Sequence, residues 1–263
     1  MLGYSWFRVY ARLKNVKGEA YNNFAKQLYA EYPVFWIAYI SGNYDLIIDI
    51  FAKNANEFNA VFSKILQKSK GIMQSYDTMI LLELDLYSYN YFSDKKASSN
   101  KIIMFKNISN IKIDEIYKKI LQLIKFDSRI AYEDIAKEIG LSRNAIKNRI
   151  IRLERQKIIA GYKIIVNFRH FGKQSFKILV KYNNSNVEQE LELLDYLENK
   201  KVVIAAMKLL GKWNLDIEVH ADNVKELQQF IIDLRNKNEI IGDYEIIQII
   251  EHFENDFYPE KLV

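Results

Sequence analysis

The sequence predicts an α+β fold in which two ferredoxin-like βαββαβ sandwiches flank a three-helix winged helix-turn-helix. Three observations support this prediction: a long internal repeat, the same order of strand and helix patterns in both copies, and three short amphipathic helices between the copies. The expected organisation is a first ferredoxin-like domain at residues 1–90, a linker at 91–110, the winged helix-turn-helix at 111–168 and a second ferredoxin-like domain at 169–263.

The internal repeat has a constant offset of 169 positions. Gly42-Asn43-Tyr44-Asp45-Leu46 and Gly211-Lys212-Trp213-Asn214-Leu215 share a pattern of glycine, any residue, an aromatic residue, Asp or Asn, and leucine. The same offset aligns further identical residues: Gly3 with Gly172, Phe7 with Phe176, Ala52 with Ala221, Asn54 with Asn223, and Glu57 with Glu226. A series of this length indicates duplication of a whole structural unit.

Each copy shows the same order of elements. The second copy predicts a strand at 176–182, a helix at 187–199, strands at 202–209 and 215–219, a helix from the cap Asn223 to 235, and a strand at 244–253. The first copy predicts the matching elements at 7–13, 19–31, 34–41, 46–52, 54–66 and 76–86. Large apolar residues lie on both sides of several strands, so we expect the two copies to cover one another as a pseudo-symmetric pair, within one chain or between chains.

The segment between the copies predicts three helices. The first begins near Asp114, the second spans 132–139 and the third spans 143–155, with a tight turn at Gly140-Leu141-Ser142. Residues 158–166 predict a β-hairpin wing that turns at Ala160-Gly161. Two short helices joined by a glycine-containing turn, followed by a wing, are typical of a winged helix-turn-helix.

The positive charge of the chain is concentrated in this segment. Residues 142–169 contain eight basic residues and one acidic residue, whereas the whole chain has a net charge of +5. We therefore predict that the third helix reads DNA bases and that basic residues beyond it neutralise phosphates. The predicted DNA-binding residues are Ser142, Arg143, Asn144, Lys147, Asn148, Arg152 and Lys163. The alternative is a helix whose charged face is merely solvated.

Residues 127–142, 149–154 and 158–162 resemble the helix-turn-helix of the Lrp/AsnC regulators, and the two glycine-aromatic loops resemble the signature of their effector-binding RAM domain. The resemblance implies a transcriptional regulator that binds double-stranded DNA, forms homo-oligomers and holds a small effector such as an amino acid. The implied effector residues are Gly42, Tyr44, Asp45, Gly211, Trp213 and Asn214. These residues could instead serve the turn and the core. The neutral Asn214 suits an α-amino group less well than Asp45.

The order of the domains departs from that family, in which a winged helix precedes the sensor domain. Residues 1–4 align with 170–173, where the preceding winged helix has just ended. We therefore expect that an upstream winged helix was lost or lies outside this chain. With one reading helix per chain, DNA recognition through two helices requires at least a dimer.

Two other functions stay open. Tandem proteins resembling this family include siroheme decarboxylases, although a concentrated basic helix is not needed by a tetrapyrrole enzyme. The protein could also be a partner that modulates other family members without binding DNA. The three histidines show no metal-ligand spacing, and we predict no cofactor, metal or catalytic residue. Without cysteines, a signal peptide or a long apolar run, we expect a cytoplasmic protein with no membrane contact.

Overall fold

The computed structural model describes residues 2–14, 18–69, 71–92, 101–105, 114–184, 186–255 and 258. Its first half contains β1 (Ser5–Leu13), α1 (Gly18–Glu31), β2 (Val34–Ser41), β3 (Leu46–Ala52), α2 (Ala55–Lys68) and β4 (Met73–Leu86). The second half repeats this order as β6 (Gln174–Tyr182), α6 (Val187–Glu198), β7 (Val203–Leu210), β8 (Leu215–Ala221), α7 (Val224–Lys237) and β9 (Ile241–Asn255). The protein is thus a mixed α/β structure, in which helices cover strands.

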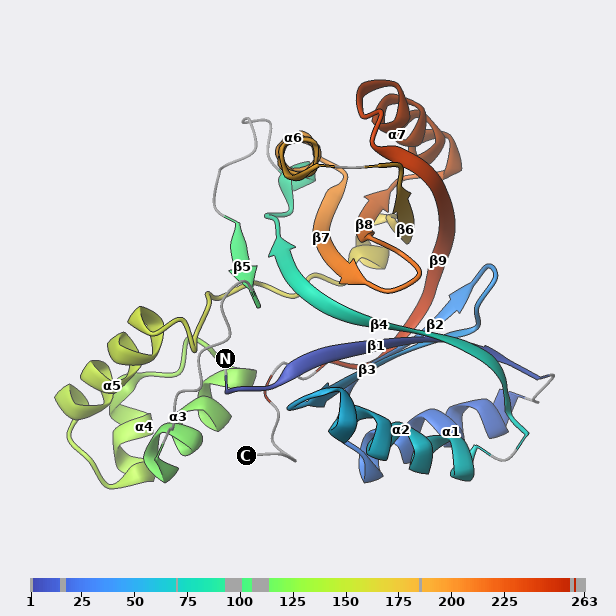
Figure 1. Ribbon diagram of the computed structural model, residues 1–263. Helices are drawn as coiled ribbons and strands as arrows, with labels where there is room; N and C mark the ends of the chain where they lie inside the picture. The colour runs from blue at the N-terminus through green and yellow to red at the C-terminus, as the bar shows by residue number, and fades with distance from the viewer. Residues whose placement is uncertain are drawn as a thin grey trace.

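The strands form a nine-stranded sheet, as far as the chain is described, in the order β1-β3-β2-β9-β6-β8-β7-β4-β5. An additional pairing of β1 with β4 closes all of these strands except β5 into a ring, which we call the barrel. The long strands β4 and β9 each pair within their own half and then with the other half (Figure 1). The two halves therefore share one continuous set of backbone hydrogen bonds.

The two junctions between the halves are equivalent under the repeat. At one junction Ile40 of β2 pairs with Ile249 of β9, and at the other Leu209 of β7 pairs with Leu81 of β4. Because the paired residues correspond, the halves are related by a pseudo-twofold axis within one chain. Helices α1 and α2 cover the outer face of one half, and α6 and α7 cover the outer face of the other (Figure 1).

The same residue types start equivalent helices in both halves. Asn54 caps α2 by accepting a hydrogen bond of 3.0 Å from the backbone N–H of Glu57, and Asn223 caps α7 by accepting one of 3.0 Å from Glu226. Each glutamate in turn accepts a hydrogen bond from the backbone N–H that precedes its cap, at 2.7 Å in α2 and 2.6 Å in α7. This reciprocal bonding satisfies N–H groups that the first helical turn leaves without partners.

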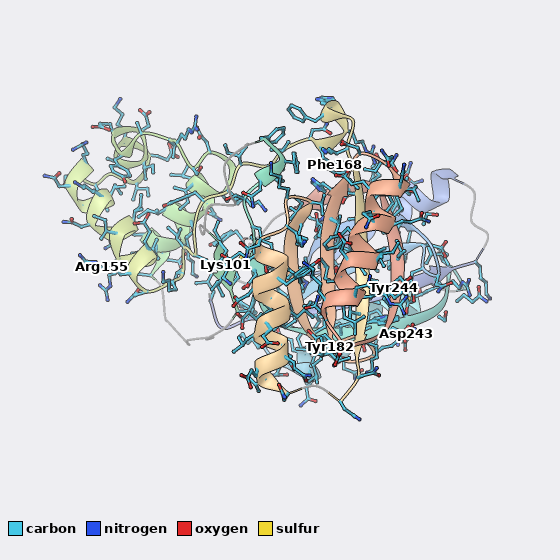
Figure 2. The ribbon with its side chains drawn as sticks, turned by 90° about the horizontal axis from the view of Figure 1, so that it is seen from above. Lys101, Arg155, Phe168, Tyr182, Asp243 and Tyr244 are labelled. Atoms are coloured by element: carbon cyan, nitrogen blue, oxygen red, sulfur yellow. The ribbon has the colours of Figure 1, made fainter. Side chains whose placement is uncertain are left out.

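Between the halves lie β5 (Ile102–Met104) and three helices, α3 (Glu115–Phe126), α4 (Tyr132–Ile139) and α5 (Arg143–Arg155). The three helices form a small body to one side of the barrel (Figures 1 and 2), which packs around its own apolar core. Gly140 ends α4 in the left-handed conformation, with φ 77°, and this allows the sharp turn into α5. The turn expected from the sequence is confirmed.

One expectation for the connecting segments is wrong. The hairpin expected at residues 158–166 is absent, because this fully described segment contains no strand. It instead runs against the strand β5, which the sequence did not predict, so closely that a Cβ on Gly161 would lie 2.8 Å from the side chain of Ile102. β5 pairs with β4, and Lys101 beside it forms ion pairs of 3.2 Å with Asp85 and 2.8 Å with Glu198.

Candidate functional site

The outer face of α5 is the basic surface that the sequence predicts to bind DNA. Five of the predicted DNA-binding side chains lie on it and are exposed to solvent: Arg143, Asn144, Lys147, Asn148 and Arg152. Ser142 caps the helix, and its hydroxyl accepts a hydrogen bond of 3.2 Å from the backbone N–H of Ala145. The opposite face carries Ile146, Ile150 and Leu153, which are buried in the core of the three-helix body. This burial fixes the direction of the basic face.

Two ion pairs hold α5 against its neighbours. Arg143 pairs with Glu133 of α4, and both side chains remain about half exposed. Arg149 pairs with Asp114 at 3.0 Å and lies 4.6 Å from the centre of the Tyr117 ring. The pKa of Asp114 is lowered by the backbone hydrogen bond from Tyr117 and further by Arg149. Arg149 therefore joins α5 to the start of α3 and turns away from the exposed face.

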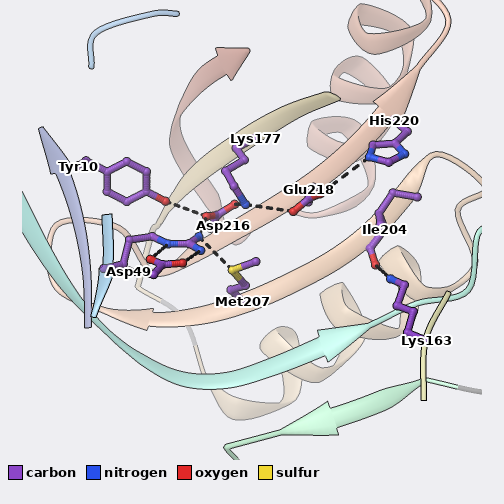
Figure 3. A network of polar contacts seen from close by, with 10 residues as sticks. Tyr10, Asp49, Lys163, Lys177, Ile204, Met207, Asp216, Glu218 and His220 are labelled. Carbon is purple, nitrogen blue, oxygen red and sulfur yellow. Dashed lines mark hydrogen bonds and ion pairs between the residues drawn. The ribbon is translucent and has the colours of Figure 1, made fainter. Parts of the chain in front are cut away.

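Lys163 does not lie on the predicted DNA-binding surface. Its ammonium points toward the barrel, where Nζ lies 3.5 Å from the carbonyl oxygen of Ile204 (Figure 3) and 4.7 Å from the centre of the Tyr89 ring. Burial lowers its pKa, although the negative charge of Glu218 opposes that change. Its assignment as a DNA contact is corrected, because the segment after α5 lies against the barrel instead of forming a wing.

The two glycine-aromatic loops pack against the opposite half of the chain. A Cβ on Gly42 would lie 3.2 Å from the carbonyl oxygen of Ile246 in β9. A Cβ on Gly211 would lie 2.9 Å from the carbonyl oxygen of Thr78 in β4. Both glycines have positive φ, 146° and 150°, which other residues rarely adopt. Each glycine therefore permits both a turn and a close approach between the halves.

Polar groups of these loops bond across the same junctions. Lys212 donates hydrogen bonds of 2.7 Å to the Tyr44 hydroxyl and 2.9 Å to Asp77 in the other half. At the equivalent position of the first loop, the side chain of Asn43 is close enough to Glu245, the counterpart of Asp77, to oppose the rise in the pKa of Glu245 that burial causes. The loops thus exchange equivalent contacts, and these contacts hold the two halves together.

The acidic or amide residue of each loop has a structural partner. Asp45 accepts a hydrogen bond of 2.7 Å from the backbone N–H of Leu13, and Asn214 accepts one of 3.0 Å from Tyr182. Leu13 and Tyr182 are themselves related by the repeat offset. An oxygen acceptor is needed at both positions, and either Asp or Asn supplies it. Both aromatic residues, Tyr44 and Trp213, are buried in the core that the halves share.

Charged side chains line the inside of the barrel, and the sequence reasoning missed them. Arg8 donates hydrogen bonds of 2.8 Å and 2.7 Å to Asp49 and also pairs with Asp216. Lys177 lies 3.3 Å from both Asp216 and Glu218. The repeat relates Arg8 to Lys177 and Asp49 to Glu218, and each cation pairs with its carboxylate across neighbouring strands. The offset of 169 could therefore have found this cluster.

A histidine extends the cluster toward one side of the barrel. His220 is buried, and its Nδ1 lies 3.0 Å from the Tyr91 hydroxyl, while Nε2 lies 3.8 Å from Glu218. Burial lowers the pKa of His220 to about 4, although Glu218 opposes the change. Burial alone would raise the pKa of Glu218, but the charge of Lys177 and the nearby histidines lower it to about 2. The histidine is therefore neutral and the glutamate charged at neutral pH.

A cavity of about 550 Å³ lies between the barrel and the three-helix body. The barrel contributes inward-facing residues that include Trp6, Arg8 and Trp36. The other side is formed by β5, by α3 and by the segment 158–163 after α5.

Among the described residues, no helix combines the length and apolar character needed to cross a membrane.

Comparison with known proteins identifies the three-helix body. Residues 113–154 match the AsnC-type helix-turn-helix domain. An uncharacterized HTH-type transcriptional regulator of Pyrococcus abyssi is 30% identical over 124 residues, covering 47% of this chain and 80% of the relative. The HTH-type transcriptional regulator FL11 of Pyrococcus furiosus is 24% identical over 151 residues, covering 57% of this chain and 97% of FL11.

Solved structures share the fold over different lengths. The L-Met complex of a transcriptional regulator from Neisseria meningitidis matches with a TM-score of 0.51 and 15% identity, covering 58% of this chain and all of that one. The siroheme decarboxylase NirDL matches with a TM-score of 0.65 and 14% identity, covering 98% of this chain and 76% of that one. The matched helix-turn-helix and the Pyrococcus relatives agree with one another. The chain belongs to the Lrp/AsnC family of HTH-type transcriptional regulators.

Proposed function

We propose that the protein is a sequence-specific DNA-binding transcriptional regulator that reads DNA with α5. The observation that carries this proposal is the exposed basic and amide face of α5 within an AsnC-type helix-turn-helix. Its proposed DNA-binding residues are Ser142, Arg143, Asn144, Lys147, Asn148 and Arg152. We leave Lys163 out of this set, because its ammonium lies 3.5 Å from the carbonyl oxygen of Ile204 in the barrel.

The direction of α5 suits this role. Arg143 and Asn144 lie in its first turn, where a recognition helix meets base edges in the major groove. No acidic residue lies in that first turn. The backbone N–H groups at the start of α5 point out of the helix end, and together with the helix dipole they favour a phosphate. Lys147 and Arg152 lie further along the helix and would pair with phosphates on the flanks of the groove.

We further propose that residues 1–90 and 169–263 are RAM-type units and that residues 111–168 are the DNA-binding unit between them. The βαββαβ order of both halves and their reciprocal loop contacts support this division. The two RAM-type units would form a pseudo-dimer within one chain, and this pseudo-dimer would carry a single DNA-reading helix. Recognition of a twofold-symmetric operator then requires two copies of the chain.

A salt titration of duplex binding tests the DNA-binding proposal. The logarithm of the binding constant should fall linearly with the logarithm of salt concentration, with a slope of about 0.9 per neutralised phosphate. Lys147→Ala should lower this slope by about one per chain, whereas Arg143→Ala should also weaken discrimination between operator and random duplex. Lys225→Ala on the exposed surface of α7 is the matched control. Unchanged binding in both α5 variants would refute the proposal.

A tetrapyrrole decarboxylase is the second candidate, and the fold likeness to NirDL over 98% of the chain favours it. The cavity offers a place for a substrate. However, the cations among its described lining residues are Arg8, Lys125 and Lys163, and Arg8 already bonds two carboxylates. This is little positive charge for a macrocycle with many carboxylates. Incubation with siroheme, followed by absorbance and mass spectrometry, separates the candidates, because only the enzyme would release carbon dioxide from the substrate.

A further inference from the structure

The cavity between the barrel and the three-helix body has walls suited to a flat apolar molecule. Aromatic rings reach it from several elements, among them Trp6, Trp36, Phe51 and Phe105. Its volume of about 550 Å³ lies within the range of about 300–1,000 Å³ that is usual for small-molecule sites. An aromatic ligand would bury its faces against these rings and would gain from ring–ring contacts as well as from the hydrophobic effect.

Two lysines, Lys125 and Lys163, line the cavity beside charges that are already ion-paired. Arg8 and Asp49 neutralise each other through two hydrogen bonds, and Glu218 lies 3.3 Å from Lys177 behind the wall. The ammonium of Lys163 lies 4.7 Å from the centre of the Tyr89 ring, and its hydrogen bond to the carbonyl oxygen of Ile204 is long, at 3.5 Å. A desolvated cation in an apolar wall attracts a negatively charged group.

Both parts of the molecule contribute to the cavity. Leu121 and Ile124 of α3 line it from the three-helix body, and the segment 158–163 lines it directly after α5. The opposite wall belongs to strands of the barrel, including Ala205 and Met207 of β7. A molecule bound there would contact the DNA-reading body and the barrel together, and it would favour the relative position in which it makes both sets of contacts.

We propose that this cavity is a binding site for an aromatic monocarboxylate, with the carboxylate on Lys163 and the ring against Trp6 and Trp36. The bound ligand ties the three-helix body to the barrel. The site is separate from the glycine-aromatic loops, whose polar groups are used between the two halves. Ligand binding in this cavity does not require that the protein binds DNA.

Calorimetry with two matched probes tests the site. The probes are 1-naphthaleneacetate and the neutral 2-(1-naphthyl)ethanol, which share a ring system and differ in charge. The acid should bind about tenfold or more tightly than the alcohol, because a hydrogen bond to a charged group is at stake. Lys163→Met should reduce the affinity for the acid to that for the alcohol, and Lys163→Arg should restore the preference. Equal binding of both probes by the native chain, binding of neither, or an unchanged preference in Lys163→Met would overturn the proposal.

Two further variants locate the binding. Ala160 lies in the segment 158–163, which lines the cavity without regular secondary structure. Ala160→Trp should fill the cavity and abolish binding of both probes, and circular dichroism should confirm that the variant is folded. Phe171→Ala removes an exposed aromatic surface outside the cavity and should leave both affinities unchanged. The reverse result, loss in Phe171→Ala and retention in folded Ala160→Trp, would place the probe on the surface and refute the site. Hydrogen exchange in residues 158–163 and α3 should slow when 1-naphthaleneacetate is bound. Slowing confined to the barrel would refute the proposal that the ligand holds the three-helix body against the barrel.

Discussion

His220 makes the stability of the barrel depend on pH in a way that the structure defines. Its pKa is about 4, against an ordinary value of 6.5, because the imidazole is buried. Between these values the unfolded chain binds a proton that the folded chain excludes, so the free energy of unfolding falls as the pH falls. The full effect is about 3 kcal/mol, from about 1.4 kcal/mol for each pKa unit. The part expected between pH 7 and pH 5 is about 2 kcal/mol.

The repeat supplies the variant that tests this effect. Phe51 occupies the position equivalent to His220, so His220→Phe places a ring of related shape there and removes the titrating group. Urea unfolding at pH 7, 6 and 5 should show the native chain losing about 2 kcal/mol more than this variant. The window stays above the range in which Glu218 titrates. His170→Gln at an exposed position is the control and should keep the native dependence. If His220→Phe loses as much stability as the native chain, the reasoning is wrong.

Three other substitutions have expected outcomes in the same unfolding assay. Gly211→Ala should cost more stability than Gly71→Ala, because both have positive φ but a Cβ would meet Met79 and Thr78 only at Gly211; equal losses would contradict this. Arg8→Met should cost about 3–5 kcal/mol, since it leaves the buried Asp49 without its cation and Asp216 with Lys177 alone, and a loss under 1 kcal/mol would contradict the ion-pair geometry. Asn223→Ala should cost about 1 kcal/mol through the lost helix cap, and a neutral result would show that the cap is not needed.

Features of the fold that depend on local interactions could be predicted from the sequence, and features that depend on contacts between distant segments could not. The order of elements in both halves and the turn at Gly140 were predictable because hydrophobic periodicity and caps are local signals. The closure of the strands into a ring was not, because it depends on which edges meet between distant segments. The charges inside the barrel were not predictable from periodicity, because charged residues that alternate with apolar ones, as Asp216 and Glu218 do in β8, are expected to face solvent. Comparison of Arg8 with Lys177 at the repeat offset would have revealed them.

The misplaced Lys163 shows a different limit. A basic residue after a recognition helix normally points to DNA, and the sequence contains nothing local that contradicts this. The position of Lys163 is set instead by β5, whose contact with Gly161 draws the segment toward the barrel. That strand lies in a stretch whose composition predicted only a linker. Tertiary packing over a distance of some 60 residues therefore decides the role of this side chain.

The difference between Asp45 and Asn214 offers a final test of whether the loops are built for structure or for an effector. Each side chain accepts a hydrogen bond from a backbone N–H at the end of its neighbouring strand. Asn214→Asp keeps an oxygen acceptor and should change the free energy of unfolding by less than about 0.5 kcal/mol at pH 7, whereas Asn214→Ala should cost about 1–3 kcal/mol. The same pair of changes at Asp45, to Asn and to Ala, should give the same ranking. An effector site for an amino group would respond differently, because the charge of Asp45 would then matter for binding while stability stayed unchanged. Titration of the Asp45→Asn variant with amino acids, beside its unfolding curve, distinguishes the two roles.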